Sequence, residues 1–426
     1  MKIEIFKLSN GIRVISVPMK ERKSVSVGIW VHVGGRDEEP RLNGASHFLE
    51  HLVFKGTARR TANEIKESVE GVGGSLNAFT SEEYTCFLAK AASRHLDQVF
   101  DVLSDMVLMA SLKDDDIKKE RTVIMEEIKM TQDQPSQLVD EILTELMWPA
   151  HALGRPITGS LESVGGLSTK DITGYRDRYY EPSLITIVAA GDIHQKKLVK
   201  LANAHYQSIK SRNNKKINLF KQTQDKPRVK FISKGTEQTH LALGVHAFSK
   251  QNPEEYALEI LSVILGGNMS SRLFNKVREE RGLAYEIGTY TRKFHETGAF
   301  GVAAGVDNKK AKEALEVIIG ELHAMTTDRV SPGELKRAKE FYLGQMALGL
   351  ESTMSNMLWA GEYMVCLGRC RTPEEVTCKI EKITSDDLRR VAKKIFENRK
   401  FSLAVVGPDA ARLEKDCQKI FSSLSR

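Results

Sequence analysis

The run His47-Phe48-Leu49-Glu50-His51 lies in a segment, residues 43–57, that is typical of one short helix. Small and polar residues before the run suit a helix start, and Gly56 suits its end. His47 and His51 are four positions apart, so both imidazoles leave the same face and can reach one metal ion. The intervening apolar residues indicate a buried helix, and buried imidazoles beside a carboxylate require partners.

This combination of residues indicates a catalytic zinc site. Two neutral imidazoles and a carboxylate from elsewhere in the chain would leave a fourth coordination position open for water. Zinc lowers the pKa of that water toward ~7, and Glu50 can take its proton as it attacks a peptide carbonyl. The order is the inverse of the His-Glu-x-x-His metallopeptidase motif. Because so short a motif also occurs by chance, the rest of the chain must support it.

Composition indicates an ordinary globular protein. The chain has 426 residues, of which 41% are hydrophobic and 28% are charged, and this length favours two domains. The net charge of +7 is too modest to favour nucleic-acid binding. We expect no targeting segment and no membrane contact, because neither a leader pattern nor a run of about 18 apolar residues is present. Five irregularly spaced cysteines indicate a reducing compartment, so we expect a cytoplasmic protein without disulfides.

The chain divides into two halves around a basic segment without periodicity. We expect a zinc-bearing N-terminal half at residues 1–207, a linker at 208–227 and a C-terminal half at 228–426. Each half ends with a capped helix, an apolar strand and a Gly-Asp or Gly-Pro-Asp turn, and the two copies are separated by roughly 216 residues. This pattern predicts a duplicated α+β fold, although convergent α+β patterning is an alternative.

A second helix, beginning near Asp114, offers carboxylates for the metal. Glu120 and Glu127 are seven positions apart and share one face, whereas Glu126 points about 100° away. One of the two can complete the metal site and the other can orient a ligand from behind it. For Glu126 we expect a solvated position.

With these motifs the chain resembles the pitrilysin metallopeptidases, a family that includes mitochondrial processing peptidase and its bacterial relatives. In that family the third zinc ligand lies where this chain has Glu127, 76 positions after His51, and the supporting carboxylate matches Glu120. The resemblance implies Zn²⁺-dependent hydrolysis of peptides or short unfolded segments inside a chamber. It also implies two homologous halves, each a mainly antiparallel sheet covered by helices, in a clamshell arrangement.

Two further motifs strengthen the resemblance. In the family, the stretch matching residues 73–80 is an edge strand that receives the substrate as an added strand, with Asn77 and Ala78 contacting the peptide backbone. Without the resemblance the same stretch would be read as a structural hairpin. A second match brings Arg278 and Tyr285 toward the zinc from the C-terminal half. The implied roles are holding the substrate and donating to the oxyanion.

One departure and one alternative accompany these expectations. Gln137 stands where the processing peptidases have an acid that reads arginine, so arginine-directed presequence cleavage is not expected. The alternative function is a non-catalytic scaffold or partner subunit, but such family members lose zinc ligands.

Because the zinc motif and the Arg278–Tyr285 pair share one chain, we expect a homodimer, with a heterodimer containing a degenerate paralogue as the alternative.

Overall fold

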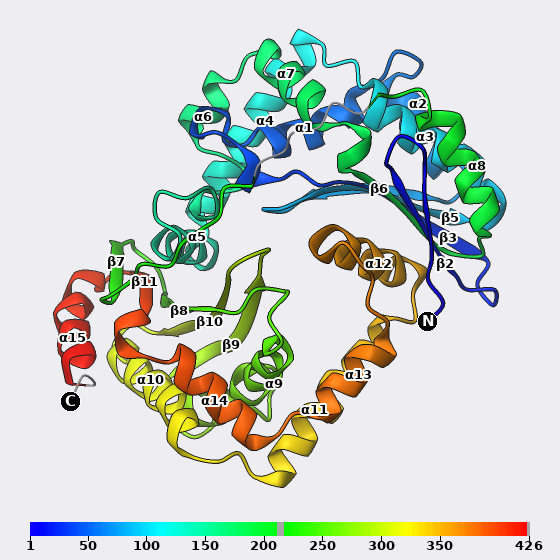
Figure 1. Cartoon of the computed structure of the whole chain (residues 1–426). Coiled ribbons are helices and arrows are strands. Elements are labelled where there is room, and N and C mark those ends of the chain that lie inside the picture. The colour runs from blue at the N-terminus through cyan, green and yellow to red at the C-terminus, as the bar shows by residue number, and fades with distance from the viewer. Residues whose placement is uncertain (211–216, 424–426) are drawn as a thin grey trace. The chain divides into compact units, whose positions relative to one another are not determined.

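The computed structural model describes residues 1–210 and 217–423 and contains two compact units (Figure 1). Unit 1 comprises Met1–Lys129, Arg155–Asn218 and Ala347–Glu374, and unit 2 comprises Met130–Gly154, Leu219–Met346 and the chain from Glu375 onward. Each unit therefore takes a segment from the opposite half of the sequence, which the continuous ranges 1–207 and 228–426 did not anticipate. Within the predicted linker, residues 217–227 contain neither helix nor strand, and residues 211–216 lie outside the described part.

Unit 1 is built on a six-stranded sheet with the order β1-β2-β6-β3-β5-β4. Its strands are β1 (Glu4–Lys7), β2 (Arg13–Pro18), β3 (Ser24–Val31), β4 (Ser75–Thr80), β5 (Thr85–Ala92) and β6 (Ile185–Gly191). Only β2 and β6 pair in parallel; all other neighbours are antiparallel. The strand predicted at residues 75–80 is thus at the sheet edge, with Ala78 opposite Phe87 of β5.

Unit 2 contains a five-stranded sheet with the order β7-β11-β8-β10-β9. Its strands are β7 (Arg228–Ser233), β8 (Gln238–Ala247), β9 (Ala284–Lys293), β10 (Gly298–Asp307) and β11 (Ser402–Gly407). Only β7 and β11 are parallel, so order and orientation match those of β2-β6-β3-β5-β4.

The repeat extends to the helix before the last strand of each sheet. Ser168 and Asp171 form a capping box at the start of α7 (Thr169–Tyr179), and Thr384 and Asp387 do the same for α14 (Ser385–Ile395). The predicted α+β class, with two similar mainly antiparallel sheets covered by helices, is confirmed.

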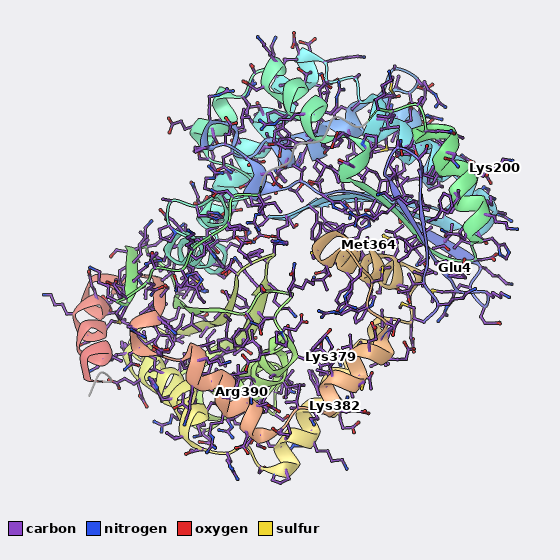
Figure 2. The ribbon with its side chains drawn as sticks, in the orientation of Figure 1. Glu4, Lys200, Met364, Lys379, Lys382 and Arg390 are labelled. Carbon is purple, nitrogen blue, oxygen red and sulfur yellow. The ribbon has the colours of Figure 1, made fainter. Side chains whose placement is uncertain are left out.

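Each sheet has one face covered by a helix from the other half of the chain. In unit 1, α12 (Thr353–Leu367) packs on β3 and β6 and buries Met357 and Met364. Exposed charges such as Lys200 lie on α8 (Gln195–Tyr206) (Figure 2). In unit 2, α5 (Pro135–Met147) packs on β8 and β11. The remaining α-helices have the following bounds: α1 (Ala45–Leu52), α2 (Ala62–Glu70), α3 (Leu96–Met109), α4 (Asp114–Asp133), α6 (Leu161–Gly166), α8 (Gln195–Tyr206), α9 (Glu255–Gly266), α10 (Ala311–Thr327), α11 (Pro332–Gly349), α13 (Pro373–Glu381) and α15 (Ala410–Ser423). Among the described residues, no helix combines the length and apolar character needed to cross a bilayer.

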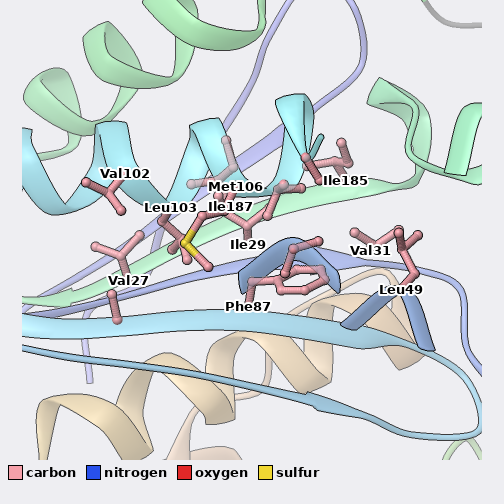
Figure 3. Packing of buried hydrophobic residues seen from close by; sticks show 14 of the residues in the cluster. Val27, Ile29, Val31, Leu49, Phe87, Val102, Leu103, Met106, Ile185 and Ile187 are labelled. Carbon is pink, nitrogen blue, oxygen red and sulfur yellow. The ribbon is translucent and has the colours of Figure 1, made fainter. Parts of the chain in front are cut away.

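Helix α1 is fixed to the sheet of unit 1 by its apolar side chains. Phe48, Leu49 and Leu52 are at most 1% exposed. Leu49 lies in the same cluster as Val31 of β3 and Phe87 of β5, and α3 packs on the same face of the sheet (Figure 3). Because full burial of each such side chain contributes about 1.5–3 kcal/mol, the orientation of α1 is set by packing rather than by helix propensity.

The start of α1 is held by a buried carboxylate. Gly44 adopts the left-handed conformation, with φ 94°, and has no side chain that could cap the helix. Glu38 supplies the cap instead: its Oε2 accepts from the amide of Gly44 at 2.7 Å and its Oε1 from that of Ser46 at 2.7 Å. Asn43 adds a third bond to Oε2 at 3.1 Å. Burial raises the pKa of Glu38 to about 7, and these three donors oppose the rise.

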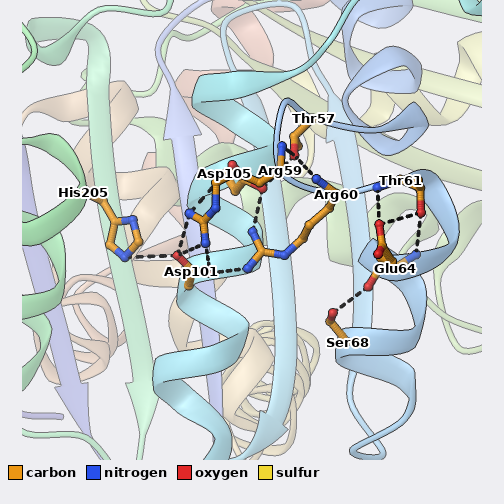
Figure 4. Close-up of polar contacts among 9 residues, drawn as sticks. All are labelled: Thr57, Arg59, Arg60, Thr61, Glu64, Ser68, Asp101, Asp105 and His205. Atoms are coloured by element: carbon orange, nitrogen blue, oxygen red, sulfur yellow. Dashed lines mark hydrogen bonds and ion pairs between the residues drawn. The ribbon is translucent and has the colours of Figure 1, made fainter.

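The chain that leaves α1 is anchored by an ion-pair network on α3 (Figure 4). Thr57 donates to Asp105 at 2.8 Å, and Arg60 pairs with the same carboxylate at 2.6 Å. Arg59 donates to Asp101 with two nitrogens, Nη1 at 3.1 Å and Nη2 at 2.9 Å. Both ends of α1 are therefore restrained by side chains outside the helix.

The cap predicts a specific sensitivity at Glu38. Glu38→Gln has only one acceptor oxygen, so it should leave one buried amide unpaired and lower the free energy of unfolding by about 1–3 kcal/mol. Glu39→Gln, at the exposed neighbouring position, is the matched control and should stay within about 0.5 kcal/mol. Denaturant unfolding of the purified variants measures both values, and equal effects at the two positions would contradict this assignment.

Candidate metal centre

Three predicted ligands converge on one point in unit 1. The ligand atoms of His47, His51 and Glu127 all lie within 4.8 Å of one another. Glu127 Oε2 is 3.8 Å from Nε2 of His47 and 3.8 Å from Nε2 of His51. Tetrahedral bonds of ~2 Å would separate neighbouring ligand atoms by ~3.3 Å, so this donor set fits a zinc ion after a small contraction.

The imidazole of His47 is arranged to remain neutral. The ring centroids of His47 and His51 are 4.7 Å apart on the same face of α1. Burial, with a smaller contribution from His51, lowers the pKa of His47 to about 4. A neutral imidazole is the form that binds a metal, so His47 is ready to coordinate at neutral pH.

A carboxylate on α4 orients one of these ligands from behind. Glu120 is 6% exposed, and its Oε2 lies 3.3 Å from Nδ1 of His51. An acceptor at Nδ1 fixes the tautomer that leaves Nε2 free for a metal. Lys55 approaches the other oxygen of Glu120 at 2.6 Å and balances its charge. Glu126, expected to be solvated, is exposed and pairs with Lys129.

Glu50 borders the three ligands and contacts the edge strand. Its Oε2 accepts a hydrogen bond of 2.6 Å from Thr80, the last residue of β4. Burial raises the pKa of Glu50, and the Glu127 carboxylate adds to the rise, while Thr80 and His51 oppose it. A half-buried carboxylate with a raised pKa is suited to accept and return a proton.

The edge strand β4 presents main-chain groups beside Glu50. Asn77 is exposed, and its Oδ1 accepts from the amide of Ala78 at 2.8 Å. The amide of Ser81 bonds across the hairpin, so strand alternation turns the amides of Ala78 and Thr80 away from β5. These outward-facing main-chain groups form a template on which an extended peptide can add as a strand.

Arg278 and Tyr285 lie together in unit 2. Arg278 belongs to a π-helical turn, Phe274–Glu279, and its guanidinium carbon is 4.7 Å from the Phe274 ring centroid. The same carbon is 5.5 Å from the ring centroid of Tyr285, which is 73% exposed. The pair is preorganised within its own unit and has an accessible phenol.

Three residues near the centre had escaped the sequence analysis: Glu38, Lys55 and Thr80. Lys55 carried a usable signal, because it stands four positions after His51. Glu38 and Thr80 reach α1 from a loop and a strand, and their contacts follow no helical spacing. Only the folded structure places them beside the metal-binding helix.

Comparison with known proteins agrees with this geometry. The family model "Insulinase (Peptidase family M16)" matches residues 13–160, and "Peptidase M16 inactive domain" matches residues 166–342. An uncharacterised zinc protease of Streptomyces coelicolor is 35% identical, with 94% of this chain and 88% of that protein covered. The uncharacterised zinc protease YmxG of Bacillus subtilis is 34% identical over 95% of this chain and 98% of its own length.

Solved structures give the same result for the fold. A protease from Helicobacter pylori superposes with a TM-score of 0.90 and 26% identity, covering 95% of this chain and 99% of that chain. A Pseudomonas fluorescens protein described as a peptidase M16 inactive domain has a TM-score of 0.88 at 15% identity, over 96% and 98% of the two chains. The chain therefore belongs to the M16 family of peptidases, the pitrilysin-type zinc metallopeptidases.

Proposed function

We propose that this protein is a zinc endopeptidase that cleaves peptides or short unfolded segments. The observation that carries the proposal is the convergence of His47, His51 and Glu127 within 4.8 Å. Glu50 lies beside them, on the same helix as the two histidines. A non-catalytic scaffold would not need this donor set together with a partly buried carboxylate. The M16 membership and the zinc-protease names of the relatives support the same reading.

Substrate binds as an added strand along β4 in this proposal. The outward amide of Ala78 donates to a peptide carbonyl once the Asn77 side chain releases it. Main-chain pairing of this kind requires an extended peptide and reads little of its side chains. Folded proteins do not offer such a free strand, which accounts for a preference for unfolded segments.

Hydrolysis then depends on groups held around α1. When bound, zinc acts as a Lewis acid that lowers the pKa of water toward ~7 and polarises a carbonyl. Glu50 takes the proton of the attacking water and returns it to the leaving amine. Glu120 keeps His51 in the ligating tautomer, and Lys55 pairs with the other oxygen of Glu120.

Arg278 and Tyr285 complete the proposal from unit 2. Arg278 holds the substrate main chain or carboxylate, and the phenol of Tyr285 donates to the oxyanion. Near Gln137, the acid Asp140 is already engaged by Arg292 and by the hydroxyl of Tyr290. Because Asp140 already pairs with these two residues, we do not expect it to bind an arginine of the substrate. The contacts therefore support a preference other than arginine near the scissile bond.

We also propose a homodimer that encloses the substrate. The zinc ligands and the Arg278–Tyr285 pair are present in one chain, so a specialised partner is not required. Twofold symmetry lets each subunit close the other's chamber, whereas a heterodimer would add a paralogue without a complete site.

The zinc assignment predicts separable effects of ligand and base substitutions. Purified protein should hold about one zinc per chain, and His51→Ala or Glu127→Gln should lose it. Glu50→Gln should keep zinc and fold but lose kcat by ~100- to 10,000-fold, because only proton transfer is removed. Metal analysis and peptide-library digestion before and after chelation provide the measurements.

Glu126→Gln is the matched control, since Glu126 precedes Glu127 on α4 and is exposed. It should retain both zinc and turnover. A Glu50→Gln protein with near-normal turnover would rule out Glu50 as the base.

The oxyanion role predicts a selective loss at Tyr285. Tyr285→Phe should reduce kcat by ~10- to 1,000-fold and leave the zinc content unchanged, because only the donor hydroxyl is lost. Steady-state kinetics with a fluorogenic peptide measures the change. Unaltered kcat would remove Tyr285 from the mechanism.

The assembly proposal predicts the mass of the protein expressed alone. Light scattering should give about twice the chain mass of 47.7 kDa, and the same sample should cleave peptides. An inactive monomer that gains activity only with a second gene product would favour the heterodimer.

A further inference from the structure

The hydrogen bond from Thr80 to Glu50 connects the edge strand to the candidate base. Thr80 ends β4 and Glu50 lies on α1, and the Thr80 hydroxyl donates to Glu50 Oε2 at 2.6 Å. We infer that Thr80 is a positioning residue that holds the Glu50 carboxylate for proton transfer and couples it to the substrate-binding strand. This inference rests on the proposed function.

The backbone at Thr80 is restrained by the turn that follows it. The amide of Ser81 donates to the carbonyl of Tyr84 at 2.8 Å, and the amide of Tyr84 donates back to Ser81 Oγ at 3.2 Å. On the outer side, Gly35 donates to the Ser81 carbonyl at 3.1 Å. A Cβ at Gly34 would lie 2.1 Å from that carbonyl oxygen, so the approach requires glycine. Thr80 therefore holds Glu50 from a fixed position.

This hydrogen bond gives the two carboxylate oxygens of Glu50 different roles. Oε2 accepts from Thr80, so proton exchange with water falls to Oε1 of Glu50. The terminal torsion of glutamate is broad and does not by itself select one orientation. A short bond to a fixed hydroxyl supplies this selection, and a base held in place lowers the barrier by orientation alone.

Thr80 also belongs to the strand edge on which the substrate is proposed to bind. The amide of Thr80 faces away from β5, as that of Ala78 does, so both belong to the edge on which a peptide adds. A peptide paired with this edge is thereby placed relative to Glu50 through one residue. Thr80 thus sets the register between the bound strand and the base.

The hydroxyl can be removed without changing the shape of the side chain. Thr80→Val should reduce kcat by ~10- to 100-fold with KM and zinc content little changed, and Thr80→Ser should recover most of the loss. Thr85→Val is the matched control, since Thr85 faces Thr80 across the hairpin and donates to the Val33 carbonyl instead. It should lower thermal stability without the loss of kcat.

A second readout does not depend on catalysis. In zinc-free protein, Thr80→Val should lower the unfolding temperature by about 2 °C, and this loss should vanish in a Glu50→Ala background. Equal shifts of the unfolding temperature with Glu50 and with Glu50→Ala would show that the Thr80–Glu50 hydrogen bond does not stabilise the protein. Wild-type kcat in Thr80→Val, or a Thr80→Ser variant as slow as Thr80→Val, would overturn the positioning role. Wild-type protein without chelator-sensitive hydrolysis would overturn the proposed function and this role with it, while the temperature shifts would still decide the contact.

Discussion

The burial of α1 against the sheet of unit 1 is the constraint on which the metal centre depends. Eight residues form too short a helix to be stable alone, so Phe48, Leu49 and Leu52 fix it through packing. Its polar face then carries His47 and His51 at a spacing that one ion can bridge. The Glu38 cap and the ion pairs on α3 hold both ends, so the imidazoles are positioned before any metal arrives.

The duplicated sheets give the centre its surroundings. Five strands have the same order and orientation in both units. The helix α1, which follows β3 in unit 1, carries histidines, whereas α9, which follows β8 in unit 2, carries none. The exchanged helices α12 and α5 cover the face of each sheet that its own half leaves open. The same architecture therefore provides a helix with candidate metal ligands and an edge strand in unit 1, and an arginine–tyrosine pair in unit 2.

Much of this could be predicted, because helical periodicity converts spacing into direction. Intervals of four and seven residues predicted that His47 and His51 share one helix face and that Glu120 and Glu127 share another. The resemblance, rather than the spacing, implied that Glu127 is the ligand. The duplication followed from two capped helices before apolar strands. Helix exchange between the halves could not be predicted, because an apolar helix face does not specify which sheet covers it. The contacts of Glu38 and Thr80 also remained hidden, since loops and strand ends bring them to α1 without any periodic relation.

Anomalous diffraction at the zinc absorption edge tests the central claim most directly. Crystals grown from protein purified without added metal should show one strong peak per chain, about 2 Å from Nε2 of His47, Nε2 of His51 and a carboxylate oxygen of Glu127. A peak at another cluster of side chains, or none after zinc is supplied, would contradict the account.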